Sequence, residues 1–193
     1  MTKFTLFDTA IGACSVAWGE RGIVGFQLPE AREDATRARV RKRHPDAMEA
    51  SPPPEILPVI ERIRALMAGE KIDLADVSLN MEGVPDFERR VYEVARSIPP
   101  GATLTYGEIA TRLGDKALAR DVGQALGRNP FPIVVPCHRV LAAGGRTGGF
   151  SARGGVATKM RILAIEGART GDEPMLFDSL PIAAPGLKRQ QMR

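Results

Sequence analysis

Cysteine and histidine are both scarce in this sequence, since its 193 residues include only two of each. The cysteines are Cys14 and Cys137, no Cys-x-x-Cys pair occurs, and the histidines are not clustered. These absences exclude the disulfide framework of small secreted proteins, and they argue against a structural zinc site of familiar spacing. We therefore expect a reducing compartment and no bound metal.

Long apolar runs are also absent. The N-terminal segment has no apolar stretch of the kind that a signal peptide needs, and nowhere does an apolar run approach the length of a membrane span. We therefore expect a cytoplasmic protein without a membrane partner. The length allows one large domain or two small ones with an ordinary buried core.

The formal net charge of +4 is unevenly distributed along the chain. Residues 85–170 carry 13 Lys and Arg against 7 Asp and Glu, whereas residues 1–84 carry 11 against 13 and residues 171–193 carry 3 against 3. The whole positive excess therefore lies in the middle segment. A polyanionic partner for that segment would explain the excess, and so would a solvated basic surface.

The first part of the chain predicts strands followed by helices. Apolar residues alternate from Phe4 to Leu28 around Gly-containing turns, which indicates antiparallel strands. Residues 31–44 predict a helix whose basic cluster is either a DNA contact or, as most such runs are, a solvated helix face. After a break at residues 51–54, helical spacing predicts a second helix over 56–67 with Gly69 as its cap. The basic cluster consists of Arg37, Arg39, Arg41, Lys42 and Arg43.

The pattern changes near residue 84, and we place a domain boundary there. Three helices are predicted next: one with Asp86 as its N-cap, one that begins with a capping box formed by Thr105 and Glu108, and one over 116–127. Two short helices joined by a tight turn, the second carrying arginine, are typical of a helix-turn-helix. Many small helical bundles share this pattern.

Residues 129–140 carry the candidate chemistry. A short apolar run from Ile133 to Val135, ended by a proline, predicts a buried strand that delivers Cys137 from the core beside His138. A thiol with a pKa of about 8.5 needs a neighbouring base or positive charge to become a nucleophile at neutral pH. His138 and Arg139 could supply both. The alternative is a buried structural cysteine beside a chance histidine.

The sequence after this stretch is rich in glycine. Residues 144–155 include six glycines among twelve residues, a composition that lets the backbone approach a ligand closely. A helix over 156–166, closed by Gly167, is predicted to follow. Residues 171–193 are predicted to form a tail that lies on the surface or is disordered.

Four motifs in order resemble those of one family. The segment Pro136-Cys137-His138-Arg139-Val140, preceded by Gly127-Arg128-Asn129-Pro130, resembles the active-site motif of the O6-alkylguanine-DNA alkyltransferases, also called methylated-DNA-protein-cysteine methyltransferases. The other matching segments are Thr105-Tyr106-Gly107-Glu108-Ile109-Ala110, Ala119-Arg120 to Asn129-Pro130, and Gly149-Phe150-Ser151 to Lys159. The similarity extends over residues 86–167.

The resemblance implies two domains and a tail. Residues 1–84 look more loosely like the family's N-terminal α/β domain, which has a ribonuclease-H-like sheet and contributes no catalytic side chain. Residues 85–170 would form a mainly α-helical, winged helix-turn-helix-like domain that binds DNA and carries out catalysis. Residues 171–193 would be the tail.

The catalytic roles that the resemblance implies fall on four residues. Cys137 would be the nucleophile that attacks the alkyl carbon. His138, polarised by Glu166 and acting through water, would take the thiol proton. Asn129 would fix the turn around the active site.

Five further residues would contact DNA or the flipped base by the same resemblance. Arg120 would fill the gap in the base stack, and Tyr106 would press on the phosphate and hydrogen-bond to or protonate the guanine ring. Ser151 and the backbone around Val140 would line the base pocket, and Lys159 would also belong to this DNA or base site.

The implied activity is a single, stoichiometric transfer of an alkyl group to Cys137. Its source would be O6-alkylguanine, and less readily O4-alkylthymine, in double-stranded DNA. The protein would act as a monomer without a metal or a cofactor.

Two positions depart from the family pattern. Phe150 stands where some members have tyrosine, which removes a hydroxyl contact. Asp121 puts a carboxylate beside Arg120 where the family often has a small neutral residue, and an anion facing phosphates would weaken DNA binding.

Two other functions compete with this interpretation. A thiol hydrolase or peptidase normally takes its histidine from elsewhere in the chain and needs an oxyanion hole, so the adjacent Cys137 and His138 fit it poorly. An alkyltransferase-like protein that flips a damaged base without repairing it typically has another residue at the nucleophile position. Cys137 therefore favours the enzyme.

Overall fold

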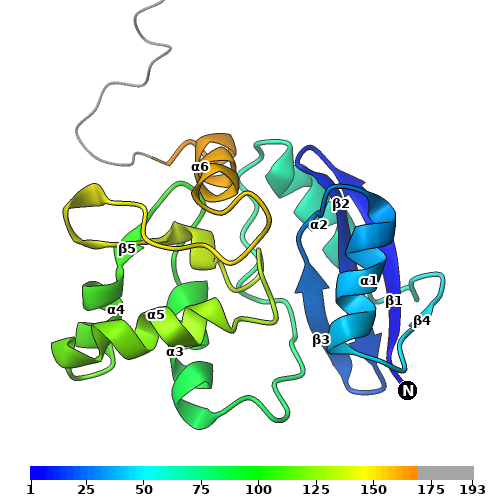
Figure 1. The fold of residues 1–193 in the computed structure, drawn as a ribbon, viewed down its shortest axis with the longest axis horizontal. Coiled ribbons are helices and arrows are strands. Elements are labelled where there is room, and N and C mark those ends of the chain that lie inside the picture. The colour runs from blue at the N-terminus through cyan, green and yellow to red at the C-terminus, as the bar shows by residue number, and fades with distance from the viewer. Residues whose placement is uncertain (169–193) are drawn as a thin grey trace, which may run out of the picture.

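The N-terminal part of the chain is built on one sheet. The structure is a computed structural model and describes residues 1–168 (Figure 1), so the predicted tail over 171–193 lies outside the described residues. The strands of the sheet are β1 (Lys3–Thr9), β2 (Gly12–Gly19), β3 (Gly22–Gln27) and β4 (Met48–Glu49). Strand β2 pairs antiparallel with both β1 and β3, and β4 pairs parallel with β1. The order is β3-β2-β1-β4, which confirms the predicted antiparallel strands.

Two helices cover the two faces of this sheet (Figure 1). Helix α1 (Glu33–Arg43) packs Val40 into a small cluster with Phe4. Helix α2 (Leu57–Met67) buries Ile63 in the main core on the other face. Alternate residues of a strand point to opposite faces, so the central strand β2 is buried on both sides.

The second half of the described chain is mainly helical, and it lies beside the sheet in Figure 1. Its elements are α3 (Asp86–Arg96), β5 (Leu104–Thr105), α4 (Tyr106–Arg112), η1 (Lys116–Leu118), α5 (Ala119–Gly127), η2 (Cys137–Arg139), β6 (Val140–Leu141), η3 (Ala143–Gly145) and α6 (Val156–Ile165). Strands β5 and β6 pair in parallel, with Leu104 opposite Val140. This pairing brings the start of α4 next to the segment that contains Cys137.

Hydrogen bonds and backbone angles confirm three predicted helix boundaries. Thr105 and Glu108 form the capping box: the Glu108 amide donates to Thr105 Oγ1 at 3.1 Å, and the Thr105 amide donates to Glu108 Oε2 at 2.6 Å. Gly69 and Gly167 follow their helices at φ values of +99° and +65°, in the left-handed region that glycine adopts without a Cβ clash.

Two predicted helix details are wrong. The N-cap of α3 is Pro85, whose carbonyl accepts a 3.0 Å bond from the Arg89 amide, and Asp86 is the first helical residue. An acidic side chain in the first turn still interacts favourably with the helix dipole. The helix expected over 116–127 is divided into η1 and α5, because the Asp115 side chain accepts a 2.8 Å bond from the Ala117 amide and begins a separate short turn.

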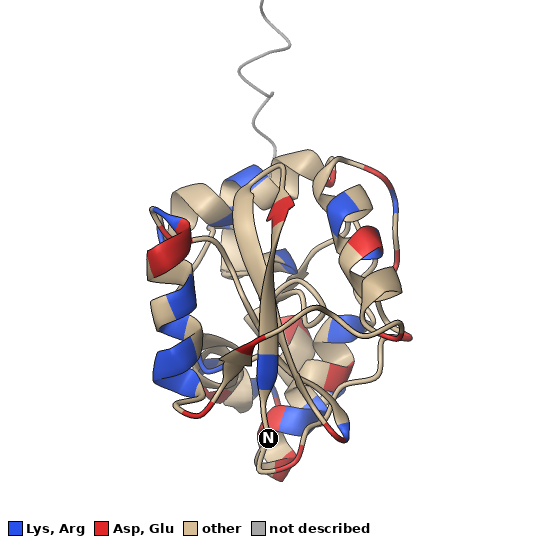
Figure 2. Cartoon of the chain, turned by 90° about the vertical axis from the view of Figure 1, so that its right-hand side faces the viewer, with Lys and Arg blue, Asp and Glu red and all other residues tan. Residues whose placement is uncertain are grey.

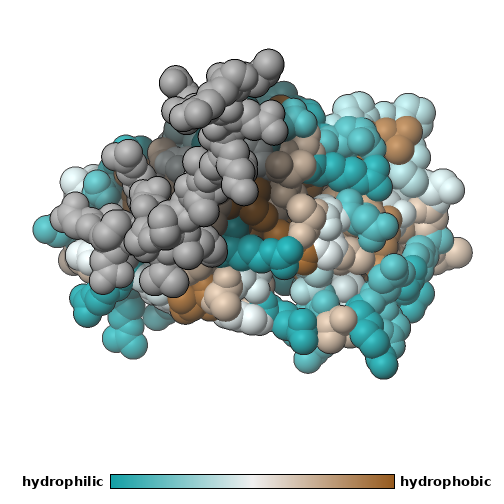
Figure 3. Space-filling model, turned by 90° about the horizontal axis from the view of Figure 1, so that it is seen from above, coloured by the Kyte–Doolittle hydropathy of each residue, from teal (hydrophilic) through white to brown (hydrophobic). Residues whose placement is uncertain are grey.

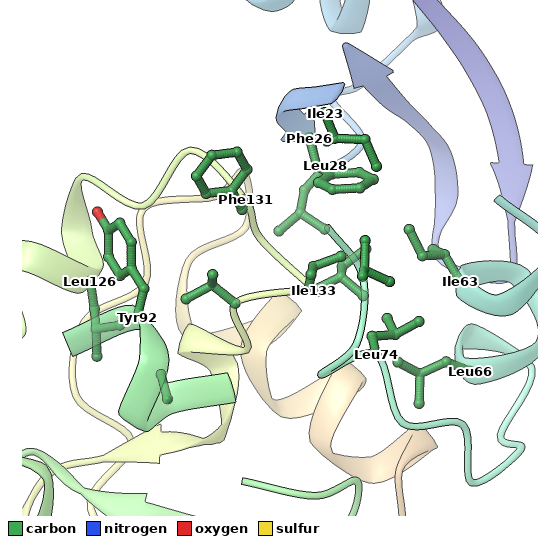
Figure 4. Close-up of a cluster of buried hydrophobic side chains, with 14 of the residues drawn as sticks. Ile23, Phe26, Leu28, Ile63, Leu66, Leu74, Tyr92, Leu126, Phe131 and Ile133 are labelled. Atoms are coloured by element: carbon green, nitrogen blue, oxygen red, sulfur yellow. The ribbon is translucent and has the colours of Figure 1, made fainter. Parts of the chain in front are cut away.

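A single hydrophobic cluster joins the sheet to the helical part (Figure 4). Phe131 and Ile133 come from the segment before Cys137, and they lie between sheet residues such as Phe26 and helix residues such as Tyr92 and Leu126. Both are at least 98% buried, with exposures of 1% and 2%. The segment that leads to the thiol is therefore anchored by both halves of the molecule.

The molecular surface is mixed in polarity. The coloured part of the face in Figure 3 is mostly hydrophilic, with separate hydrophobic patches between the hydrophilic areas. Within residues 1–168, no helix combines the length and the apolar character needed to cross a membrane.

Candidate active site

The segment from Asn129 to Val135 is a buried turn, so the predicted strand over 133–135 is wrong. Asn129 bridges the turn: its Oδ1 accepts from the Phe131 amide, and its Nδ2 donates to the Val135 carbonyl, both at 2.8 Å. Ile133 has a φ of +76°, which lies outside the range of a strand.

Prolines explain why this apolar run does not form a strand. Pro130, Pro132 and Pro136 have no amide hydrogen and therefore cannot donate to a strand ladder. The Val135 amide instead donates to the Phe131 carbonyl at 2.7 Å, within the turn. Burial was predicted correctly, but the backbone hydrogen bonds are made locally and through Asn129.

Cys137 begins η2 and is partly exposed at the wall of a pocket of about 560 Å³. This volume lies in the range of sites that bind small molecules. The lining residues are Tyr106, Ala119, Arg120, Gly123, Leu126, Gly127, Cys137, Gly149, Phe150 and Ser151. The pocket therefore brings together four of the predicted site residues: Cys137, Tyr106, Arg120 and Ser151.

The glycine-rich loop packs directly on Tyr106. A Cβ atom at Gly148 would lie 2.9 Å from Cε2 and 3.0 Å from the hydroxyl of Tyr106, and the φ of Gly148 is +66°. Only glycine fits this position without displacing the ring. Residues 149–151 of the same loop then line the pocket.

Of the two departures from the family pattern, Phe150 lines the pocket and Asp121 does not. Asp121 lies in the first turn of α5, and it lines a separate hollow with Gln124 and Arg128. Its carboxylate is therefore placed at the helix N-terminus, where a negative charge is favourable.

Behind Cys137, His138 belongs to a buried network centred on the Glu166 carboxylate. The distance from His138 Nε2 to Glu166 Oε1 is 3.0 Å. Arg139 donates to the same carboxylate from Nε to Oε2 at 2.9 Å and from Nη2 to Oε1 at 2.7 Å, and from Nη1 to the Ile98 carbonyl at 2.6 Å. Lys71 also donates to the backbone carbonyl of Glu166. His138 and Glu166 are each 1% exposed.

The network sets the charge state of each group. Burial alone would raise the pKa of Glu166, but hydrogen bonds and charges from His138 and Arg139 outweigh it and lower that pKa to about 2. Burial lowers the pKa of His138, although Glu166 opposes the shift, so the imidazole is neutral at neutral pH. A neutral imidazole held by an ionised carboxylate can accept a proton.

The thiol of Cys137 is protonated at rest, because burial raises its pKa. A hydrogen bond from Asn129 and the positive charge of Lys159 act in the opposite direction. Proton removal must therefore accompany nucleophilic attack by this thiol.

Lys159 and Val140, both predicted to belong to the DNA or base site, do not line the pocket and contact each other inside the protein. Lys159 is 0% exposed, its Nζ donates to the Val140 carbonyl at 2.5 Å, and it lies 5.8 Å from the centroid of the Tyr106 ring. Burial lowers the pKa of Lys159 to about 8. The Lys159 ammonium group therefore lies inside the protein, bonded to the Val140 carbonyl and close to the Tyr106 ring.

Arg139 is the residue whose position the sequence did not predict. Because Arg139 is next to His138 in the sequence, it was predicted to supply a positive charge near the thiol. In the structure its guanidinium instead binds the carboxylate of Glu166, which lies 27 positions later in the chain. The sequence could not reveal this ion pair, because it forms only when the fold packs α6 against η2.

A cysteine at the wall of a pocket, backed by a histidine and an ionised carboxylate, defines a protein that uses cysteine as a nucleophile. The profile of the "6-O-methylguanine DNA methyltransferase, DNA binding domain" family matches residues 86–168. A methylated-DNA–protein-cysteine methyltransferase of Methanothermobacter thermautotrophicus is 40% identical over 152 residues, which cover 79% of this chain and 78% of that protein. This chain belongs to the methylated-DNA–protein-cysteine methyltransferase family.

Two further similarities bear on DNA. The crystal structure of Mycobacterium tuberculosis OGT in complex with DNA matches with a TM-score of 0.68 and 30% identity, covering 88% of this chain and 96% of that chain. A protein of Thermus thermophilus named DNA base-flipping protein is 39% identical over 132 residues, which cover 67% of this chain and 87% of that protein.

Proposed function

We propose that this protein repairs alkylated DNA by transferring an alkyl group from O6 of guanine to Cys137, once per molecule. The observation that carries the proposal is the partly exposed Cys137 in a pocket that also contains Arg120 and Tyr106, in front of the buried His138–Glu166 pair. O4-alkylthymine is the slower substrate.

The transfer balances without a cofactor. The Sγ atom of Cys137 forms a bond to the alkyl carbon, the bond from that carbon to O6 breaks, and its electron pair stays on guanine. The thiol proton passes through water to His138, and guanine gains a proton from the Tyr106 hydroxyl, which lines the pocket. The Tyr106 hydroxyl then regains a proton from water while His138 releases its proton to water, so no net charge remains on the protein. The product is a thioether without an easy leaving group, which is why each molecule reacts once.

The helices α4 and α5 act as the helix-turn-helix, within a winged helix-turn-helix-like domain over residues 85–170. The positive excess of that segment supports binding to a polyanion. A base must leave the duplex before its O6 substituent can reach a thiol, at a cost of a few kcal/mol. Arg120, exposed at the start of α5 and lining the pocket, fills the gap that the base leaves.

Residues 1–84 form the N-terminal domain, with a ribonuclease-H-like sheet. Its contribution is to support the segment before Cys137: the Phe26 amide donates to the Pro130 carbonyl at 2.9 Å. The contacts of Phe131 and Ile133 with the sheet also hold this segment in place.

Base flipping without repair is the second candidate function, favoured by the name of the Thermus relative. Methylation of Cys137 distinguishes repair from base flipping alone. After incubation with duplex DNA that contains O6-methylguanine, the peptide with Cys137 should gain one methyl group. An unmodified peptide, with DNA binding retained, would support flipping alone.

The role of Arg120 has its own test. Arg120→Ala should slow repair in duplex DNA far more than reaction with free O6-benzylguanine, because a free base needs no extrusion. Lys3→Ala, which removes an exposed charge from β1, outside both the helix-turn-helix and the pocket, is the control. Equal losses with both substrates would contradict a flipping role.

A further inference from the structure

The cations of helix α1 fall into two groups. Arg37 is paired with Glu33 and Glu49, both at 3.0 Å, and the Arg41 guanidinium lies 5.5 Å from the centroid of the Phe4 ring. Lys42, in contrast, has no ion pair with any residue among 1–168. Figure 2 shows the basic side of this helix at the edge of the molecule. Part of the predicted solvated cluster is therefore neutralised, and part is not.

The unneutralised side of α1 faces a groove, called here the α1 groove. It has a volume of about 520 Å³ and is closed on the other side by the loop at Ser151 to Arg153. Its lining residues are Glu30, Ala35, Ala38, Arg39, Lys42, Ser151, Ala152 and Arg153. Three cations, Arg39, Lys42 and Arg153, line the groove together with one carboxylate, that of Glu30. Glu30 pairs with Arg39 at 3.3 Å, so the charges of Lys42 and Arg153 remain uncompensated within the groove.

The α1 groove adjoins the active-site pocket, since the two share a lining residue. A small hollow of about 50 Å³ lies between them, and it shares Cys137 and Phe150 with the pocket and Arg39 and Ala152 with the groove. Ser151 lines all three spaces. Ser151 therefore separates the space that would take the flipped nucleotide from the cations of the groove.

We propose that the α1 groove binds the phosphodiester backbone of the same DNA duplex, on one side of the flipped nucleotide. The inference rests on the proposed function, since it needs a nucleotide in the pocket. Lys42 and Arg153 are exposed and have no carboxylate partner among residues 1–168, so they meet phosphates without breaking an existing ion pair. Contacts of this kind add affinity that is independent of sequence and sensitive to salt.

Salt dependence tests the inference most directly. The double variant Lys42→Ala/Arg153→Ala is compared with Lys3→Ala/Arg41→Ala, which removes the same charge from residues that do not line the groove. Each lost phosphate contact lowers the slope of log affinity against log salt by about 0.9. We expect the first variant to lose up to about 2 in slope and the control to keep the parent value. Equal slopes in the two variants would overturn the inference.

Two shortened duplexes locate the contact. Each one ends close to O6-methylguanine on one side and extends fully on the other. The affinity difference between the groove variant and the parent should vanish with one shortened duplex and persist with the other. A difference that persists with both would overturn a backbone contact on one side.

Failure of the proposed function is distinguishable from failure of this inference. Methyl transfer by the unaltered protein to Cys137, followed in the same samples, tests the function alone. Thermal unfolding of both double variants shows whether each remains folded.

Discussion

Arginine–carboxylate pairs occur in two different settings in this molecule. The side chains of Arg139 and Glu166 meet at 2.7 Å with exposures of 4% and 0%, whereas those of Arg37 and Glu33 meet at 3.0 Å with exposures of 30% and 56%. The buried pair is isolated from water, so removing one partner leaves an uncompensated charge. The exposed pair is solvated whether or not it forms.

The comparison separates two uses of charge. The buried network fixes the protonation states of His138 and Glu166 in the segment that contains the thiol. The exposed ion pairs of Arg37 stabilise the fold only slightly, and on the same helix Lys42 is exposed without a carboxylate partner among residues 1–168. In the proposed function the buried network serves the chemistry, and in the proposed α1 groove exposed cations serve DNA binding.

The largest expected effect is the loss of Arg139. Arg139→Met leaves Glu166 buried without its main partner, and breaking a buried pair typically costs about 3–5 kcal/mol. Urea unfolding should show a loss of this size. The double variant Arg139→Met/Glu166→Gln should lose less than Arg139→Met, because no unpaired carboxylate remains. A larger loss in the double variant would contradict the proposed charge balance.

Acid should also remove the contribution that ionised Glu166 makes to the free energy of unfolding, because protonation abolishes its pairing with Arg139. The pKa of Glu166 is about 2 in the folded protein against an ordinary value of 4.5, so its contribution is complete above about pH 5 and is lost as the pH falls toward 2. The difference corresponds to roughly 3 kcal/mol. Stability measured from pH 6 to pH 2 should fall less steeply in Arg139→Met/Glu166→Gln than in the parent. Parallel curves would show that Glu166 is not responsible.

A smaller effect is expected at the glycine-rich loop. Gly148→Ala places a Cβ within 3.0 Å of the Tyr106 ring at a positive φ, a strain of about 1–2 kcal/mol. Gly149→Ala is the control, because a Cβ there meets no atom of residues 1–168 within 4 Å. Thermal unfolding should separate the two variants. If both melt together, the loop does not pack on Tyr106 in this way.

The smallest effect is expected on α1. Arg37→Ala removes two ion pairs, but they are exposed and screened by salt. Its Tm should differ little from that of the parent at moderate ionic strength. A loss comparable to that of Arg139→Met would invalidate the distinction between the two settings.

Local features of this fold could be predicted from the sequence, because their determinants are close in the chain. The capping box at Thr105 and the glycine stops at Gly69 and Gly167 depend on residues within one helical turn. The placement of Tyr106, Arg120 and Ser151 around Cys137 was predicted as well, but only through the family resemblance.

Other features depend on contacts between distant segments. The apolar run over 133–135 has the composition of a strand, and its turn is decided by the neighbouring prolines and by Asn129. The burial of Lys159 follows from the packing of α6 against the Val140 segment, which the sequence pattern of a helix does not reveal. The role of Arg139 was missed for the same reason.

The stoichiometry of methyl transfer tests the central claim most directly. The protein is incubated with an excess of duplex DNA containing O6-methylguanine, and the restored guanine is counted per molecule of protein while the modified peptide is identified by mass. We predict that one guanine is restored per chain, that one methyl group is found on Cys137, and that Cys137→Ala restores none. Repeated turnover, or a methyl group on another residue, would contradict the account.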